Sequence, residues 1–366
     1  MKVLMIGTDK KIFENSSEAR QRMIEYGRLA EQLYIIVFST QKFSFSQISE
    51  NTFLYPTNSF SRWCYIFDAA KIAKKIIGNW KLEIGNSRNN FLITSQDPFE
   101  TGLIGWLIAQ KFKIPLQLQI HTDFLNSYFR QESFLNKIRV LLAKFLIPRA
   151  ACVRVVSERI KKSLPQAKVR VLPIFIDINK IKNAPIKTNL RRKYPRFDFI
   201  ILMASRLTAE KNIGLAVEAT AEAIKDYPKT GLIIIGNGPE QKNLKFQISN
   251  LKINENIIME DWTDDLASYY KTADLFLLTS NYEGYGRTII EAVVSGCGVI
   301  SSKVGIADEI LLKENIFEVG NKEQLKEKII KAVRGELKMP NADYLAKMST
   351  KEEYLRAYKT SWENCG

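Results

Sequence analysis

The regular alternation of short apolar runs with longer amphipathic runs constrains the fold of this chain more than any other feature. Short runs rich in β-branched residues occur at positions 3–6, 34–38, 91–94, 116–120 and 153–156, and the stretches between them are long enough for helices. Strands that alternate with helices form βαβ units around a parallel sheet. The first half of the chain is therefore predicted to be an α/β domain.

The same alternation restarts in the second half, after residues 185–196, which are rich in Lys, Arg and Pro and typical of an exposed linker or domain edge. Further strand-like runs lie at 199–203, 231–235, 256–259, 275–279 and 298–301. The 366 residues also exceed the roughly 250 to 300 that one hydrophobic core accommodates. We expect two tandem Rossmann-like domains, residues 1–172 and 173–349. A C-terminal helix within residues 350–366 is expected to pack on either domain, including back on the first.

The positive charge of the chain lies almost entirely in its first half. Residues 1–172 carry a net charge of +13, from 26 Lys/Arg and 13 Asp/Glu, whereas residues 173–366 carry +2. Such asymmetry favours contact with a polyanion, either a membrane leaflet or a nucleic acid, with a merely solvated basic surface as an equal alternative. Within this half, the run 135–149 alternates basic and apolar residues as a membrane-surface helix does, although a packed helix with a basic outer face has the same pattern.

The four cysteines and the single histidine form no zinc-binding pattern. The cysteines are scattered without a Cys-x-x-Cys pair, which fits a reducing cytoplasm. No stretch approaches the ~20 apolar residues that span a bilayer, and the N-terminus lacks the features of a secretory leader. We expect a cytoplasmic protein, attached at most to the inner face of the membrane.

Polar residues follow the predicted strands of the second half, at the sheet edge where open parallel sheets bind ligands. Arg206 and Lys211 follow the run 199–203, where two cations could clamp a diphosphate, although two solvated charges would look the same. Gly236 and Gly238 follow the run 231–235 and permit a tight turn and close backbone approach to a ligand. This Gly-x-Gly turn alone is weak evidence for a ligand site, because ordinary turns between a strand and a helix have the same residues.

The segment 281–296 carries the strongest signal. Gly284 and Gly286 permit close approach of the backbone, and a helix that opens near Gly286 would point free N–H groups at an anion. Glu283 could accept hydrogen bonds from sugar hydroxyls. Glu291 lies eight positions further on, in an apolar helical stretch where a ribose diol would satisfy it, unless it faces solvent.

Candidates in the first half are less specific. His121 and Asp123 directly follow the strand-like run 116–120, and His121 is as consistent with sugar binding or catalysis as with a core position. Asp97 is a candidate for acceptor or sugar contacts, or a cap before Pro98. Ser16 and Ser17 precede a predicted helix whose first N–H groups could bind phosphates.

The segment 281–296 resembles the Glu-x7-Glu signature of family-4 glycosyltransferases. These are retaining enzymes of the GT-B architecture, in which two Rossmann-like domains face each other across a cleft. The pair Arg206 and Lys211, the turn 236–238 and the run 295–302 occur in the order that this family shows, and together the motifs cover most of residues 198–310.

The resemblance implies a role for each of these residues. Arg206 and Lys211 would hold the donor pyrophosphate, Glu283 the transferred sugar and Glu291 the ribose, and His121 would contact the donor sugar. Further residues implied to line the donor are Gly236, Gly284, Tyr285, Gly286, Arg287 and Thr288. Residues 260–263 occupy the nucleobase position, where Trp262 departs from the commoner glycine-containing pattern. The loop 7–19 also lacks the Gly-Gly pair of many relatives.

These observations predict a retaining, metal-independent hexosyltransferase. It would move sugar from a UDP- or GDP-sugar to a glycan or lipid-linked acceptor in polysaccharide or glycolipid synthesis. No Asp-x-Asp motif stands at a strand end, and no metal or other cofactor is expected. Alternatives are a sugar-nucleotide epimerase or hydrolase of the same fold, and a basic nucleic-acid-binding protein. The acidic Glu283 and Glu291 beside the glycine-rich loop argue against a nucleic-acid partner.

Overall fold

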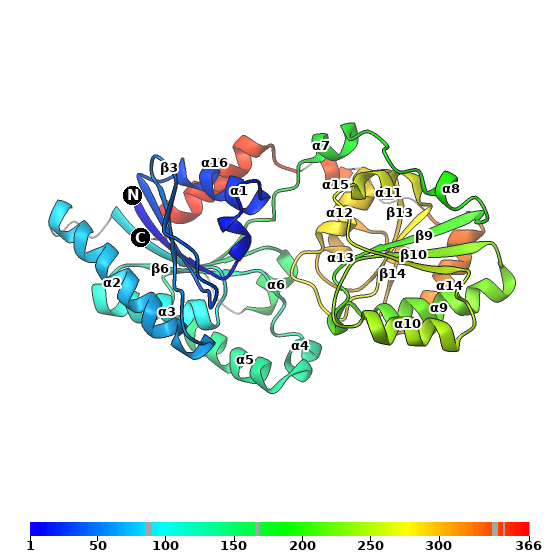
Figure 1. Ribbon diagram of the computed structural model, residues 1–366, viewed down its shortest axis with the longest axis horizontal. Coiled ribbons are helices and arrows are strands. Elements are labelled where there is room, and N and C mark those ends of the chain that lie inside the picture. Colours follow the sequence, from blue (N-terminus) through cyan, green and yellow to red (C-terminus); the bar gives the residue numbers. More distant parts are fainter. Residues whose placement is uncertain (85–89, 165–167, 339–342, 347, 366) are drawn as a thin grey trace. The chain divides into compact units, whose positions relative to one another are not determined.

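The chain divides into two compact units (Figure 1). A computed structural model describes residues 1–84, 90–164, 168–338, 343–346 and 348–365. Unit 1 comprises Met1–Pro173 and Ser349–Gly366, and unit 2 comprises Ile174–Met348. The division falls one residue after the predicted boundary, and the C-terminal segment belongs to unit 1. Gly366, the last residue of the predicted helical segment, lies outside the described residues.

Unit 1 is built on an eight-stranded sheet of order β3-β4-β2-β1-β5-β6-β7-β8. Its strands are β1 Lys2–Gly7, β2 Gln32–Val37, β3 Ser46–Ser49, β4 Thr52–Pro56, β5 Phe91–Ser95, β6 Leu116–Ile120, β7 Cys152–Val155 and β8 Val169–Val171. All strand pairs are parallel except β3 with β4. The sequence did not predict β3, β4 or β8. β3 is polar and only half-buried, and β8 is only three residues long, so neither shows an apolar run.

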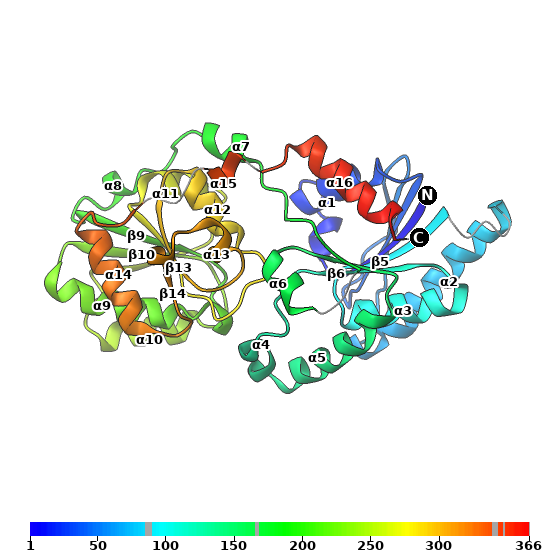
Figure 2. The same cartoon turned by 180° about the vertical axis from the view of Figure 1, so that it is seen from behind.

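Helices cover both faces of this sheet (Figures 1 and 2). Helices α2 Tyr65–Ile84, α3 Glu100–Phe112 and α5 Phe134–Leu146 pack side by side on one face. Helices α1 Glu18–Gly27 and α16 Lys351–Glu363 lie beside each other on the other face. The short helices α4 Ser127–Glu132 and α6 Glu158–Ser163 connect the strands at one end of the sheet.

Helix α16 is fastened to unit 1 by aromatic packing, a hydrogen bond and a disulfide. Tyr358 stacks on Tyr26 of α1 with ring centroids 4.1 Å apart. Gln117 of β6 donates a hydrogen bond from Nε2 to the carbonyl oxygen of Ser361 at 2.9 Å. Cys365 is disulfide-bonded to Cys152 of β7, 213 residues earlier in the chain. This bond does not fit the reducing cytoplasm predicted from the scattered cysteines, because local cysteine spacing carries no information about so distant a contact.

Unit 2 contains a six-stranded, all-parallel sheet of order β11-β10-β9-β12-β13-β14. Its strands are β9 Phe199–Ala204, β10 Thr230–Ile235, β11 Ile257–Glu260, β12 Leu275–Leu278, β13 Gly298–Ser302 and β14 Ile316–Phe317. The chain builds outward from β9 to β11, returns to pair β12 with β9, and then builds outward in the opposite direction. This reversal creates a topological switch point between β9 and β12, the position at which such sheets bind ligands.

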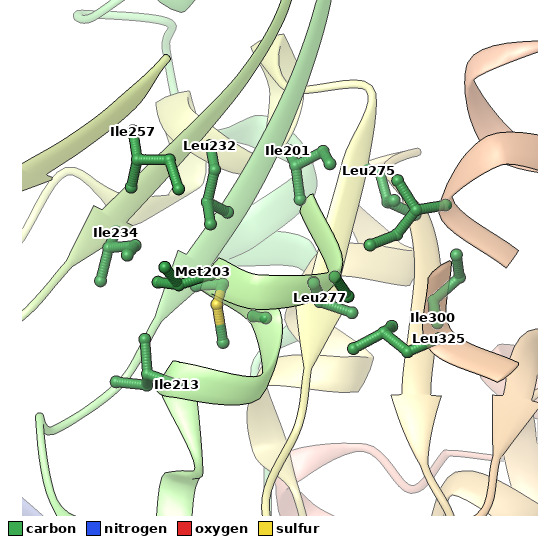
Figure 3. Packing of buried hydrophobic residues seen from close by; sticks show 14 of the residues in the cluster. Ile201, Met203, Ile213, Leu232, Ile234, Ile257, Leu275, Leu277, Ile300 and Leu325 are labelled. Carbon is green, nitrogen blue, oxygen red and sulfur yellow. The ribbon is translucent and has the colours of Figure 1, made fainter. Parts of the chain in front are cut away.

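The core of unit 2 forms between this sheet and the helices that cover it. Figure 3 shows side chains of the sheet, including Ile201, Leu232 and Leu277, packed with Ile213 and Leu325 from flanking helices. Helices α9 Ile213–Asp226, α10 Gln241–Asn250 and α14 Lys322–Val333 lie on one face. Helices α8 Leu190–Lys193, α11 Leu266–Thr272 and α12 Arg287–Val294 lie on the other. The remaining short helices of this unit include α7 Ile178–Asn183, α13 Ala307–Ile310 and α15 Asp343–Ala346.

Residues 185–196 form a domain edge, one of the two predicted alternatives, and not an exposed linker. Leu190 is fully buried, and its backbone N–H donates to Oγ1 of Thr272 at 3.1 Å. The N–H of Lys187 donates to Oγ of Ser268 at 2.9 Å. These bonds fix the segment to α11, so the exposed Lys and Arg side chains belong to the edge of unit 2.

In the described parts of the chain, none of the helices combines the length and apolar character needed to cross a bilayer.

Candidate active site

The loops that follow β9 and β12 are tied together at the switch point. The hydroxyl of Thr279 donates to the backbone carbonyls of Lys211 and Asn212 at 2.9 and 3.0 Å. The N–H of Asn281 donates to the carbonyl of Glu210 at 2.8 Å. Two segments that lie about seventy residues apart in the chain therefore share one rigid edge.

Lys211 and Glu283 meet at this edge. Nζ of Lys211 lies 2.5 Å from Oε1 of Glu283, and the side chains are only 16% and 15% exposed. Oγ of Ser280 donates to the same carboxylate oxygen at 2.8 Å. Two charge-assisted hydrogen bonds therefore orient the Glu283 carboxylate. A carboxylate that can accept hydrogen bonds from hydroxyl groups thus lies beside a cation that can bind phosphate.

Arg206 is held much more loosely than Lys211. Its guanidinium lies 3.4 Å from Oε1 of Glu210, and the side chain is 76% exposed. Ion pairs at such exposure contribute about 0–1 kcal/mol. The guanidinium can therefore leave Glu210 for a stronger anion at small cost.

Glycine is required at two turns of the site. Gly236 has φ = +151°, and a Cβ built there would lie 1.9 Å from the carbonyl oxygen of Ser205. Gly286 has φ = +90° and precedes α12 as its N-cap. Only glycine takes these conformations without strain. The predicted tight turn after β10 and the predicted helix start at Gly286 are both present.

The N-terminus of α12 lies four residues after Glu283 in the chain. No side chain caps this helix, which begins directly after Gly286. Tyr285 is buried, and its carbonyl accepts from the N–H of Ile306 at 2.9 Å. Arg287 is exposed and Thr288 partly exposed at the first turn. The first N–H groups of an uncapped helix bind anions.

Glu291 does not face solvent, which was the alternative interpretation of its position. Its side chain is 18% exposed and pairs with Arg287 at 3.4 Å. The hydroxyl of Tyr270 donates to Oε2 of Glu291 at 3.5 Å. Burial, and then the charge of Glu291, raise the pKa of Tyr270 well above its usual value of 10.0. The carboxylate is thus held in a fixed, partly buried position.

At the predicted nucleobase position, Trp262 is 50% exposed and follows a firmly bonded Glu260. The Glu260 carboxylate accepts hydrogen bonds from Lys193 and Tyr269, each at 2.7 Å, and from Tyr194. Burial opposes ionisation of Glu260, but these hydrogen bonds outweigh it and lower its pKa below 4.5. The Glu260 carboxylate is therefore bonded to residues at the edge of unit 2. The half-exposed Trp262 ring is the side chain at this position that a ligand can reach.

His121 of unit 1 adjoins a buried polar network. Its Nε2 lies 3.1 Å from Oε1 of Gln119, which also accepts from the guanidinium of buried Arg154 at 3.0 Å. His121 is exposed as a residue, yet desolvation of its ring, together with the positive charges of Arg154 and Arg22, lowers its pKa to about 3. The imidazole is therefore neutral at physiological pH.

The other candidates of unit 1 have local structural partners. Oδ1 of Asp97 accepts from the N–H groups of Phe99 and Thr101 at 2.8 and 3.3 Å, the capping role that the sequence left open. Burial raises the pKa of Asp97. Asp123 lies 3.5 Å from the guanidinium of Arg159. Ser17 is the N-cap of α1, and Ser16 beside it is exposed.

Sequence reasoning missed Gln119 and Ser280. Gln119 lies two positions before His121, so the period of a strand places both on one face of the sheet. Ser280 directly follows β12, at the edge already marked as the ligand-binding edge. Within the described residues, no group of three or more His, Cys, Asp or Glu side chains is arranged to hold a metal ion.

The two parallel-sheet units define an α/β protein of the GT-B glycosyltransferase fold. The chain superposes over its whole length on Anabaena HepE in complex with UDP and glucose, with a TM-score of 0.67, 19% identity and 96% of that chain covered. Sucrose-phosphate synthase from Thermosynechococcus elongatus gives a TM-score of 0.72 at 16% identity and is 94% covered, again with all of this chain. At these identities the likeness concerns the fold alone.

Residues 187–351 match the model of the family described as glycosyl transferases group 1. Alpha-monoglucosyldiacylglycerol synthase from Streptococcus pneumoniae is 31% identical over 236 residues, which are 60% of this chain and 53% of the relative. The enzyme of the same name from Acholeplasma laidlawii is 25% identical over 295 residues, 72% of each chain. The chain thus spans about half the length of the streptococcal relative.

Proposed function

We propose that this chain is a retaining, metal-independent glycosyltransferase. It moves a hexose-type sugar from a UDP- or GDP-sugar to a lipid-linked or glycan acceptor. The observation that carries the proposal is the Lys211–Glu283 pair, 2.5 Å apart at the switch point of a glycosyl transferases group 1 domain. A cation beside an oriented carboxylate suits a substrate in which a sugar is joined to a diphosphate.

Each group of the site has a distinct role in this proposal. Lys211, Arg206 and the N-terminus of α12 stabilise the diphosphate as negative charge develops on it. Glu283 accepts hydrogen bonds from hydroxyls of the transferred sugar, and Glu291 does so from the ribose. His121 is proposed to contact the donor sugar from unit 1. The proposed donor contacts also include Gly236, Gly284, Tyr285, Gly286, Arg287, Thr288 and Trp262. Further candidates are Ser16 and Ser17 for phosphate binding, and Asp97 and Asp123 for the acceptor.

The proposed reaction is a front-face displacement. The bond between the anomeric carbon and the diphosphate oxygen breaks while the acceptor hydroxyl oxygen bonds to the same face of that carbon. The acceptor proton passes to the departing phosphate oxygen, so the products are a glycoside of unchanged anomeric configuration and a nucleoside diphosphate. No cofactor enters this scheme.

The nature of the donor and acceptor is supported by the similar proteins. Anabaena HepE was crystallised with UDP and glucose and also with UDP-glucose, which supports a UDP-sugar donor. The two alpha-monoglucosyldiacylglycerol synthases are named for a glycolipid product, which supports a lipid acceptor.

A membrane-associated acceptor also fits the surface of α5. Phe134 and Leu141 of this helix are 75% and 68% exposed, with Leu135, Ile138 and Phe145 exposed beside them. Lys137 and Lys144 lie on the same helix. Exposed apolar side chains among basic ones suit the interface of an anionic leaflet. We propose attachment to the cytoplasmic face of a membrane through this helix.

Donor binding is tested by thermal unfolding with UDP-, GDP- and ADP-sugars. A donor at 100 times its Kd stabilises the folded state by about 2.7 kcal/mol. Stabilisation by one donor class, followed by transfer of labelled sugar to diacylglycerol or a glycan, would establish the activity. Incubation without acceptor separates the alternatives, because an epimerase or hydrolase converts the donor alone. No stabilisation by any nucleotide-sugar would refute the proposal.

A further inference from the structure

A pocket of unit 1 lies between strand β8 and helix α16. Its volume is about 380 Å³, and its walls include Arg154 of β7, Arg170 of β8 and Arg356 of α16. We call it the arginine pocket. Its residues are distinct from all those assigned to the donor or the acceptor above.

The three arginines of this pocket outnumber its one carboxylate, Glu353. Within the described part of the chain, none of them lies at ion-pair distance from an Asp or Glu side chain, and the side chains of Arg170 and Arg356 have no hydrogen-bond partner. Arg356 still interacts electrostatically with Glu353: after the hydrogen bonds from Thr350, its charge helps to lower the pKa of that carboxyl. Glu353 also lines the pocket, but its Oε2 accepts from the N–H and hydroxyl of Thr350 at 2.8 and 3.1 Å to cap α16. Positive charge therefore dominates the pocket.

Arg154 is a buried cation without a counter-ion, although its guanidinium lies over the Tyr358 ring, 4.4 Å from the ring centroid, which offsets part of the cost of burial. It is 3% exposed, and its guanidinium donates only to neutral groups, Oε1 of Gln119 at 3.0 Å and the hydroxyl of Tyr354 at 3.4 Å. Its Nε is buried without a hydrogen-bond partner. A buried cation without a counter-ion is unfavourable, and so is an unsatisfied buried N–H.

The strand register brings a second cation close to this buried one. Arg154 of β7 is the direct partner of Arg170 of β8, and adjacent strands lie only about 4.8 Å apart. Like charges in directly opposed positions repel each other. Two guanidinium groups on one side of the sheet, with a third facing them from α16, are arranged as phosphate-binding sites commonly are, because each can donate two parallel hydrogen bonds.

We propose that the arginine pocket binds a phosphate group, carried either by a small soluble ester or by a phospholipid headgroup. The walls of the pocket are held in place by the Cys152–Cys365 disulfide and by the packing of Tyr358 on Tyr26. This site is independent of the donor site proposed in unit 2.

The test compares the double variant Arg170→Ala/Arg356→Ala with the control Lys359→Ala. Lys359 lies on the same helix, is about as exposed, and is paired with Glu363 outside the pocket. If the ligand is a small ester, titration calorimetry with inorganic phosphate and glycerol 3-phosphate will show binding to the wild type that weakens about tenfold or more in the double variant, or about 1.4 kcal/mol. Lys359→Ala is expected to bind like the wild type.

Vesicles distinguish the two sources of the phosphate group. If the ligand is a headgroup, phosphatidylglycerol vesicles will bind the double variant more weakly than the wild type and Lys359→Ala, with any remaining binding due to α5, and the soluble phosphates will bind to none of the proteins. If soluble phosphate binds and the double variant loses it, the ligand is a small ester. Equal behaviour of the double variant and Lys359→Ala toward every probe would overturn the proposal.

Folding of the double variant is checked by its unfolding midpoint without ligand. Arg170 and Arg356 are exposed, so their removal leaves no buried group unpaired. The midpoint is expected to be equal to or above that of the wild type, because repulsion around Arg154 is relieved. Thermal stabilisation of the double variant by UDP-sugars is expected to equal that of the wild type. Absence of donor binding would therefore contradict the proposed function, and absence of phosphate binding would contradict the arginine pocket, each without affecting the other.

Discussion

The amide oxygen of Gln119 determines which ring nitrogen of His121 carries a proton. Gln119 uses its Nε2 hydrogens toward the hydroxyls of Thr94 and Tyr358, at 2.8 and 3.3 Å. Its Oε1 faces the guanidinium of Arg154, which can only donate. Nε2 of His121, 3.1 Å from this oxygen, must therefore be the donor, which leaves Nδ1 as an acceptor for a ligand hydroxyl.

The first prediction concerns this tautomer. Since the chain has one histidine, ¹⁵N-histidine labelling yields one unambiguous imidazole spectrum. We expect the neutral Nε2–H form and a pKa lowered from 6.5 to about 3. The unfolded chain binds the proton first, so His121 contributes stability above about pH 6.5 that is lost as the pH falls toward 3.

Gln119→Leu removes the acceptor and should give a mixture of tautomers, whereas Gln119→Glu should raise the pKa of His121. An Nδ1–H tautomer in the wild type, or a pKa near 6.5, would contradict this account.

Removal of either partner of the Lys211–Glu283 pair should slow sugar transfer. Lys211→Ala and Glu283→Gln are each expected to lower kcat by about 10²–10³, because each loses a charged group aimed at the reacting centre. The two effects should not add, since the residues share one ion pair. Lys326→Ala is the control, because it breaks an ion pair between Lys326 of α14 and Glu222 of α9, away from the site. A rate of sugar transfer near that of the wild type in either Lys211→Ala or Glu283→Gln would contradict the proposed role of that residue.

The disulfide should stabilise unit 1. Cys365→Ser opens a loop of 213 residues and is expected to lower the free energy of unfolding by about 2–4 kcal/mol. Dithiothreitol should destabilise the wild type by a similar amount and leave the variant unchanged. Cys64→Ser, at a free and partly buried cysteine, serves as the control in denaturant titrations. Equal stability of Cys365→Ser and Cys64→Ser would show that the bond does not form in solution.

Gly236 should not tolerate a side chain. Gly236→Ala places a Cβ against the carbonyl of Ser205 at positive φ, so a loss of at least about 1–3 kcal/mol and weaker donor binding are expected. Gly78→Ala, with nothing within 4 Å in the middle of α2, should instead stabilise by about 0.5–1 kcal/mol. Thermal unfolding of both variants measures these changes in stability. Equal stability of Gly236→Ala and the wild type would show that the backbone at Gly236 does not require glycine.

Leu141 should contribute to binding of anionic vesicles. Leu141→Glu removes an apolar side chain from the exposed face of α5 and adds a repelled charge, so binding should weaken at least about tenfold. Phe246→Glu on α10 changes a residue of nearly the same exposure, 70% against 68%, in the other unit. Co-sedimentation of both variants measures the difference. Equal retention would exclude α5 as the membrane-binding element.

The sequence alone determined the fold class and most of the sheet. Runs such as 199–203 and 231–235 are buried on both faces of a parallel sheet. Their sequences are therefore continuously apolar, and this local pattern is enough to predict them as strands. The glycines at 236 and 286 likewise revealed turns, because their backbone conformations exclude other residues. Such features are local, and a local pattern is sufficient to predict them.

Contacts between distant segments were decided only by the tertiary structure. Four features each join residues from separate strands, helices or loops: the Lys211–Glu283 pair, the Arg154–Gln119 bond that orients the partner of His121, the Cys152–Cys365 bond and the arginine pocket. The sequence left open whether residues 185–196 form a linker or a domain edge, and the burial of Leu190 in unit 2 decided for the edge. Side-chain partners depend on strand order and helix placement, and nothing in the local sequence specifies which distant residue will lie opposite.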